Sequence, residues 1–247
     1  MTLLGPIRRP RASTPKANPK YATGVEPLDR LLSGGLPQGQ ISEIVGPMSS
    51  GKTGLLLKIL SETTGRGERV AYVDPFHSFD PALASQSGLV LSRFLWVRSC
   101  AETTEKKLEQ AFKAVDILTR SETFYLVALD LEKPIQDLSG ARSMSVKAAS
   151  PPFSGSSQTI PFNTWFRIKK TLQGKAVSVL VVNAKPAAGS AAAVVLGLER
   201  RFVKWKSSGN RINSDLPGQT RLLQGLCSEV RLLRGKRHGR ITLHCAI

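Results

Sequence analysis

Apolar and polar positions along the chain follow two different periods, one typical of strands and one typical of helices. Short apolar runs predict strands at residues 41–45, 68–74, 93–98, 124–131 and 176–183. Helices are predicted at residues 54–64, 78–88, 102–120 and 161–173. The pattern is clearest in the third of these helices, where Leu108, Ala111, Phe112 and Val115 recur at helical spacing and charged residues occupy the other positions.

The order of these elements predicts the class of fold. Strands and helices alternate along most of the chain, which is typical of α/β proteins with a mostly parallel sheet and helices on both faces. The run FYLVALDL at residues 124–131 is almost continuously apolar, as expected for a strand covered on both sides.

Composition changes at three places and suggests the domain organisation. Residues 1–20 hold Pro, Arg, Lys and Ser without an acid, so they are interpreted as a disordered basic arm. Residues 139–158 are small, polar and rich in Pro, Gly and Ser, which predicts a flexible loop inside a core spanning 21–199. Residues 200–247 hold eleven Lys and Arg and two acids. They are interpreted as a basic β extension of short strands, the first at 200–206, with a hairpin tip at 235–239.

The charge of the chain narrows the range of partners. Lys and Arg number 35 against 18 Asp and Glu, giving a net charge of +17. Such an imbalance favours a polyanionic partner, most often nucleic acid, although a solvated basic surface is the alternative.

The cysteines, the apolar runs and the N-terminal residues indicate where in the cell the protein is expected. The three cysteines form no C-x-x-C pair, which argues against a disulfide framework or a structural zinc site. The sequence has no run of about 18 apolar residues that would predict a membrane span. Its Arg-rich beginning, with charge after a short apolar patch, differs from a secretory signal and is compatible with an organelle transit peptide. The expected location is cytoplasmic.

One segment predicts a phosphate-binding loop. GPMSSGKT fits G-x-x-x-x-G-K-[ST] and lies between a predicted strand and a predicted helix. The backbone N–H groups of such a loop face phosphates. Lys52 is expected to reach the β- and γ-phosphates, and the Thr53 hydroxyl to bind Mg²⁺. The alternative is a chance match in a Gly/Ser-rich turn. The nucleotide-binding residues predicted here are Gly46, Pro47, Met48, Ser49, Ser50, Gly51, Lys52 and Thr53.

A second predicted strand supplies an acid for the metal. Asp130 closes FYLVALD, where a carboxylate would hold the Mg²⁺ shell together with Thr53. An aspartate that merely turns the chain after the strand is the alternative. The cofactors predicted from these residues are ATP or ADP with Mg²⁺.

These segments occur in an order that resembles the core of the RecA recombinases. The resemblance rests on TGVEPLDRLLSGGLPQGQISEIVGPMSSGKT, on VAYVDPFHSFDPALASQSGL and on FYLVALDL. It covers residues 22–131 well and 161–185 loosely. It implies a RecA-like P-loop fold, and it places Asp80 near the adenine, although a helix N-cap serves that residue equally well.

The chain departs from the family where hydrolysis is controlled. The resemblance implies a water-activating glutamate at the position occupied by Phe76, and a phenyl ring can neither accept a proton nor orient water. The family's Asn-Gln pair is Asn183-Ala184 here. Residues 132–160 and 187–193 also differ from the family's DNA-binding loops. No residue is therefore assigned a catalytic role.

Two residues are candidates for the missing base. His77 follows Phe76 and could accept a proton, but a structural histidine at a strand end is the favoured interpretation. Glu43, in the first core strand, is expected to meet solvent or a basic neighbour rather than a substrate.

The departures make the chain similar to the degenerate RecA-fold proteins of bacterial mutagenesis cassettes, the ImuA and SulA-like group. That resemblance implies an accessory role in the SOS response and DNA repair. The partners it implies are single-stranded DNA or a RecA–DNA filament and translesion polymerase components. Three hypotheses follow: an accessory protein that binds ATP with little turnover, an active DNA-dependent ATPase of recombination, and a nucleotide-independent adaptor.

The basic extension leaves a further alternative open. Phe202 and Trp205 lie among its Lys and Arg residues, a composition suited to stacking bases and following a phosphate backbone. At strand spacing, Phe202 could equally belong to the core.

Overall fold

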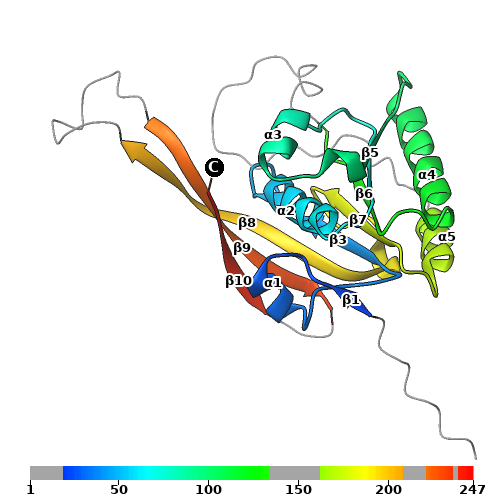
Figure 1. Ribbon diagram of the computed structural model, residues 1–247, viewed down its shortest axis with the longest axis horizontal. Coiled ribbons are helices and arrows are strands. Elements are labelled where there is room, and N and C mark those ends of the chain that lie inside the picture. Colours follow the sequence, from blue (N-terminus) through cyan, green and yellow to red (C-terminus); the bar gives the residue numbers. More distant parts are fainter. Residues whose placement is uncertain (1–18, 134–161, 208–220, 236–238, 247) are drawn as a thin grey trace, which may run out of the picture.

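A computed structural model describes residues 19–133, 162–207, 221–235 and 239–246 (Figure 1). Most of the predicted basic arm and the whole of the predicted loop 139–158 lie outside these residues. Among the described residues, no helix is both long and apolar enough to cross a membrane. The predicted division into arm, core and extension stays a prediction, although Lys20 already belongs to a short strand.

Eight strands form one mixed sheet with the order β10-β9-β8-β3-β7-β6-β4-β5. Its strands are β3 (Ile41–Val45), β4 (Val70–Asp74), β5 (Phe94–Arg98), β6 (Leu126–Asp130), β7 (Ser178–Asn183), β8 (Ala192–Ser207), β9 (Arg221–Arg234) and β10 (Arg240–Ala246). The neighbours from β8 to β5 pair in parallel, whereas β8–β9 and β9–β10 are antiparallel. A separate ribbon pairs β1 (Lys20–Tyr21) with β2 (Leu36–Pro37).

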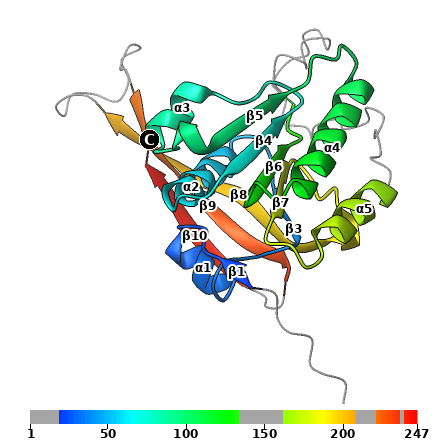
Figure 2. The same ribbon diagram turned by 45° about the vertical axis from the view of Figure 1, so that its right-hand side comes forward.

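Helices cover both faces of the sheet (Figures 1 and 2). They are α1 (Glu26–Leu31), α2 (Lys52–Gly65), α3 (Pro81–Gln86), α4 (Thr104–Arg120) and α5 (Phe162–Leu172), with short 3-10 turns η1 (Leu91–Arg93) and η3 (Gly189–Ala191). The apolar side chains of α1, α2 and α3 join one core cluster, and those of α4 and α5 join the other. Alternate residues of the buried strands point into the two clusters, as the continuous apolar runs predicted. The α/β fold class is confirmed.

The second cluster contains the largest fully buried side chain among the described residues, Trp165 of α5. Its ring meets Phe112 of α4 edge to face, with centroids 5.0 Å apart. This aromatic pair packs α4 against α5 within the second cluster.

Several predicted boundaries are wrong by a few residues for identifiable reasons. Helix α2 begins at Lys52 rather than 54, because the phosphate loop runs directly into its first turn. Helix α3 begins at Pro81 rather than 78, since the Asp80 side chain accepts N–H bonds from Ala82 and Leu83 and caps it.

The largest departure from the predicted elements concerns the C-terminal strands. The short strand predicted at 200–206 is the distal half of β8, which spans 16 residues and continues through residue 200, although its register with β9 shifts between Arg200 and Phe202. The beginning of β8 at Ala192 was not predicted, because the small residues at 187–193 give no apolar pattern typical of a strand. The predicted hairpin tip at 235–239 is consistent with β9 ending at Arg234 and β10 starting at Arg240. The basic segment therefore extends the same sheet that carries the core, and the distal parts of β8 and β9 project beyond the helices (Figure 1).

An ion-pair network lies on one side of these added strands. Arg201 and Arg231 both bind the Glu229 carboxylate, and the Arg231 guanidinium also lies 3.4 Å from Glu199. Hydrogen bonds from the two arginines, that from Arg231 first, lower the pKa of Glu229 to about 2. Part of the basic charge of the extension is thus neutralised within the protein.

Candidate nucleotide-binding site

The carboxyl ends of the parallel strands meet at one edge of the sheet, the usual place for a ligand in this type of fold. Strand β3 leads into the predicted phosphate loop, β6 ends at Asp130, and β7 ends at Asn183. Their register places Val45 opposite Asn183, and Asp130 opposite Val182. The structure therefore brings the predicted loop and the predicted metal ligand to the same edge.

The phosphate loop has a conformation that depends on its two glycines. Gly51 adopts a left-handed conformation with φ of 91° immediately before α2. A Cβ atom at Gly46 would lie 2.2 Å from the carbonyl oxygen of Leu198 in β8, and one at Gly51 would lie 2.9 Å from Ser228 Oγ in β9. Strands β8 and β9 therefore pack directly against the phosphate loop. No motif in the sequence indicates this contact.

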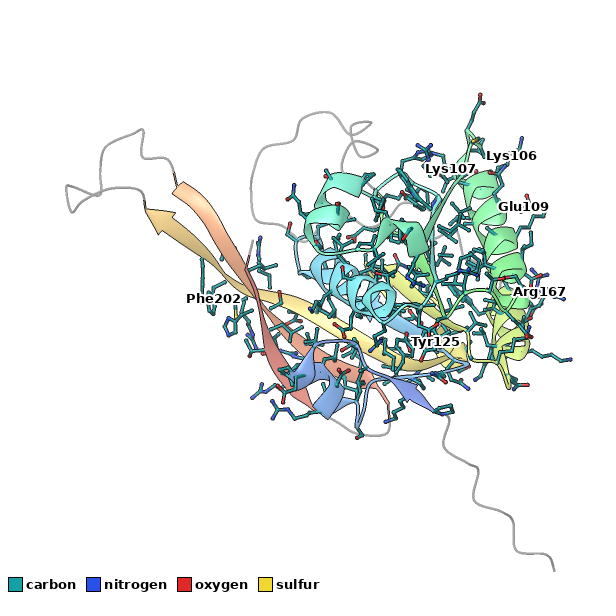
Figure 3. All side chains as sticks on the ribbon, in the orientation of Figure 1. Lys106, Lys107, Glu109, Tyr125, Arg167 and Phe202 are labelled. Atoms are coloured by element: carbon teal, nitrogen blue, oxygen red, sulfur yellow. The ribbon has the colours of Figure 1, made fainter. Side chains whose placement is uncertain are left out.

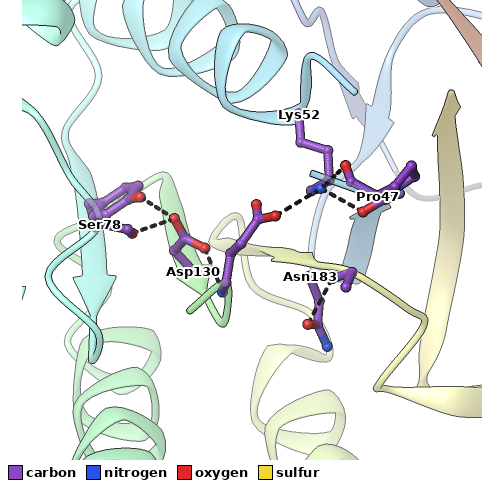
Figure 4. A network of polar contacts seen from close by, with 9 residues as sticks. Pro47, Lys52, Ser78, Asp130 and Asn183 are labelled. Carbon is purple, nitrogen blue, oxygen red and sulfur yellow. Dashed lines mark hydrogen bonds and ion pairs between the residues drawn. The ribbon is translucent and has the colours of Figure 1, made fainter. Parts of the chain in front are cut away.

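Lys52 is buried beneath the loop, with 2% of its side chain exposed. Its Nζ donates to the carbonyl oxygens of Gly46 at 2.5 Å and Pro47 at 2.7 Å. The third contact of the ammonium group is with Glu132 Oε1, 3.0 Å away (Figure 4). Glu132 was not among the predicted site residues, although a carboxylate two residues after Asp130 in LDLEKP was a visible signal.

Asp130 is held in place by three donors. Its Oδ2 accepts from Tyr72 Oη at 2.6 Å and from Ser78 Oγ at 2.9 Å, and its Oδ1 accepts from the Glu132 backbone N–H at 2.9 Å. Burial raises the pKa of Asp130, an effect that the bond from Tyr72 opposes. The carboxylate keeps lone-pair capacity on Oδ1 for a metal-bound water.

The remaining predicted ligands are compatible with a nucleotide and Mg²⁺. Thr53 is exposed at the first turn of α2. Ser50 Oγ is buried in the loop and has no hydrogen-bond partner among the described residues, so its position suits a hydroxyl that meets a ligand. No group of three or more metal-binding side chains occurs in the part of the chain that the structure describes. Mg²⁺ held mainly by nucleotide phosphates does not require one.

The position of the missing glutamate is filled by apolar packing. Phe76 is 5% exposed, and the Lys133 ammonium lies 5.5 Å from the centre of its ring. Upstream, Asp74 accepts N–H bonds from Ser78 and Phe79 and thereby shapes the turn after β4. The side chain that this turn places at position 76 cannot accept a proton or orient water.

The two substitute bases have other structural roles. His77 has a positive φ of 60°, and its Nε2 lies 2.8 Å from the carbonyl oxygen of Ser99, which supports the structural interpretation. Of the two surroundings expected for Glu43, solvent is wrong, since the residue is fully buried, whereas a basic neighbour is present in Arg234, whose charge acts on the carboxyl group. The Glu43 carboxylate accepts the backbone N–H groups of Ala187 at 2.8 Å and Ala188 at 2.9 Å, and burial raises its pKa. Glu43 thus anchors the connection between β7 and β8.

Asp80 is the N-cap of α3, with its Oδ1 bound to the N–H of Ala82 at 2.8 Å and of Leu83 at 3.2 Å. This is the alternative role foreseen for it. A contact with adenine stays a prediction. At the end of β7, the Asn183 side chain accepts the N–H of Ala184 at 2.8 Å, where the family resemblance implied a glutamine.

A Gly-rich loop between a strand and a helix, with a buried lysine and a nearby strand-end aspartate, defines a P-loop protein of the α/β class. The RecA N-terminal domain family matches residues 13–139, just over half of the chain, and the chain belongs to that family. The chain is 42% identical over 110 residues to protein RecA of Ectopseudomonas oleovorans, which is 44% of this chain and 30% of the relative. It is 39% identical over 127 residues to protein RecA of Synechococcus elongatus, covering 51% and 32%.

The chain thus spans about a third of the length of these curated relatives. Among solved structures, the RadB recombinase matches with a TM-score of 0.57 and 20% identity, over 92% of this chain and 96% of that one. At this identity the likeness supports the fold, which is the mixed α/β recombinase fold.

Proposed function

We propose that the protein binds ATP with Mg²⁺ and acts in DNA repair as an accessory to RecA or to translesion synthesis, with little or no hydrolysis. One observation carries the proposal: the phosphate loop is complete and ordered around Lys52, whereas the water-activating position holds the buried Phe76. The site thus contains the residues that would bind a nucleotide but has no carboxylate at the position that would activate water.

Residues in the loop would hold the phosphates, and Thr53 and Asp130 would hold the metal shell. The bound Mg²⁺ would neutralise phosphate charge. Without a carboxylate at position 76, a bound nucleotide would persist and stabilise one conformation of the site. Because β8 and β9 contact the loop at Gly46 and Gly51, that conformation would also affect the C-terminal strands.

The proposed partners are single-stranded DNA or a RecA–DNA filament, with translesion polymerase components as further candidates. The distal part of β8 supports a nucleic-acid contact. Phe202 is 51% exposed there, and Arg200 and Lys204 have no ion-pair or hydrogen-bond partner among the described residues (Figure 3). Exposed aromatic rings beside free cations are suited to stacking bases and binding phosphates.

Replacing Phe202 with alanine is expected to weaken binding of labelled single-stranded DNA about tenfold, because stacking contributes about 1–3 kcal/mol per base. Fluorescence anisotropy at fixed salt measures this, with the RecA–DNA filament as a second ligand. Phe166→Ala is the matched control, since that ring is 40% exposed on α5 and lies far from β8 in sequence. Equal affinities of both variants and the unmodified protein would remove β8 from the binding surface.

Two other functions remain as competitors. An active DNA-dependent ATPase would need a substitute base, and the two residues considered for it, His77 and Glu43, are bound elsewhere in the fold. A nucleotide-independent adaptor would keep its partner affinity unchanged after Lys52→Ala, with and without Mg-ATP. The accessory function instead requires that partner affinity differ between the nucleotide-bound and nucleotide-free protein.

A further inference from the structure

Glu132 occupies a position that the proposed function does not explain. Its Oε1 lies 3.0 Å from Lys52 Nζ, and 21% of its side chain is exposed. The other two contacts of the ammonium group are carbonyl oxygens of the loop itself. A lysine ammonium has no further donors. A phosphate that binds Lys52 must therefore displace one of these three contacts, and the Glu132 carboxylate is the one carried by a partly exposed side chain rather than by the loop backbone.

Glu132 is also placed firmly. Its backbone N–H donates to Asp130 Oδ1, and Asp130 is fixed in turn by Tyr72 and Ser78. From this anchored backbone the Glu132 side chain reaches Lys52 Nζ. Two carboxylates, those of Asp130 and Glu132, therefore lie at the edge of the sheet where the phosphates would bind.

These carboxylates affect free and metal-bound nucleotides differently. A metal-free triphosphate brings several negative charges, and like charges at short range in a partly buried site repel strongly. A triphosphate carrying Mg²⁺ brings less negative charge and a cation that carboxylates attract. Lys52 alone cannot produce this difference, because its positive charge favours both forms of the nucleotide.

We propose that Glu132 is a specificity-determining residue that holds Lys52 in the nucleotide-free protein and makes the site select Mg-ATP over metal-free ATP. The proposal rests on the proposed nucleotide-binding function. It assigns to Glu132 a role in selection, and it does not require hydrolysis. The displaced carboxylate would remain beside the metal, where its charge favours the metal-bound form.

The test compares the affinity for ATP in excess Mg²⁺ with the affinity in EDTA, measured by calorimetry on the full chain. In the unmodified protein we expect a large preference for Mg-ATP. Glu132→Gln removes the charge but keeps the size of the side chain, and it is expected to raise the affinity for metal-free ATP at least about tenfold. The preference for Mg-ATP should shrink by at least the same factor.

Two further variants distinguish selection from structural damage. Glu132→Asp retains the charge and should retain the preference for Mg-ATP. Glu109→Gln is the matched control, because Glu109 forms an exposed ion pair with Lys113 at 3.1 Å on α4, and it should change neither affinity (Figure 3).

An unchanged preference in Glu132→Gln would overturn the proposal while leaving nucleotide binding intact. An equal loss of affinity for ATP with and without Mg²⁺ in that variant would also overturn it, because Glu132 would then support nucleotide binding without selecting the metal-bound form. Absence of ATP binding by the unmodified protein in Mg²⁺ would overturn both this proposal and the proposed function.

Discussion

Lys52→Ala is expected to lower the affinity for Mg-ATP by about 10- to 100-fold or more. Lys52 supplies the buried cation of the phosphate loop, and a hydrogen bond to a charged group contributes about 1.5–3 kcal/mol. The substitution also leaves the carbonyl oxygens of Gly46 and Pro47 without their donor and the Glu132 carboxylate without its cation. Calorimetric titration with Mg-ATP measures the effect.

The matched control for this prediction is Lys58→Ala. Lys58 lies on the same helix, is exposed, and has no partner among the described residues, so its loss should leave affinity unchanged. Circular dichroism would establish that both variants are folded. Equal Mg-ATP affinity of Lys52→Ala and the unmodified protein would mean that the loop does not bind phosphate.

Trp165→Ala is expected to have the largest effect on stability. The indole is fully buried between α5 and the sheet and packs against Phe112. Truncating such a side chain leaves a cavity and costs about 3–5 kcal/mol. Denaturant unfolding followed by circular dichroism measures the change in the free energy of unfolding.

Phe166→Ala is the control on the adjacent residue, because 40% of that ring is exposed. Its free energy of unfolding should stay within about 1 kcal/mol of that of the unmodified protein. If Trp165→Ala were no less stable than Phe166→Ala, the second core cluster would not hold α4 and α5 in the way described here.

Local sequence signals were sufficient for the phosphate loop and for the strand that ends at Asp130. Both depend on contiguous residues: the loop on its glycines and Lys52, the strand on an apolar run that ends in a carboxylate. The helix at 104–120 could also be predicted from contiguous residues, because its apolar residues recur at helical spacing and form its buried face. These elements could be predicted because tertiary contacts reinforce their local preferences.

The elements that escaped prediction depend on contacts between distant segments. Glu43 was expected to meet solvent or a basic neighbour, but β7 and β8 flank its strand and exclude solvent, and two backbone N–H groups satisfy its carboxylate. Strand β8 was predicted too short, because its small residues become a strand only through pairing with β3 and β9. Glu132 was not predicted as a site residue, because only the fold brings it beside Lys52, which lies 80 positions earlier in the chain.

The most direct test of the central claim is the fate of ATP bound in the presence of single-stranded DNA. The protein would be incubated with radiolabelled Mg-ATP, with and without DNA, and both retained nucleotide and released phosphate would be measured. The account predicts stoichiometric binding of intact ATP and phosphate release no faster than in Lys52→Ala. Multiple turnovers stimulated by DNA and abolished in Lys52→Ala would contradict it and would make the protein an active ATPase despite Phe76.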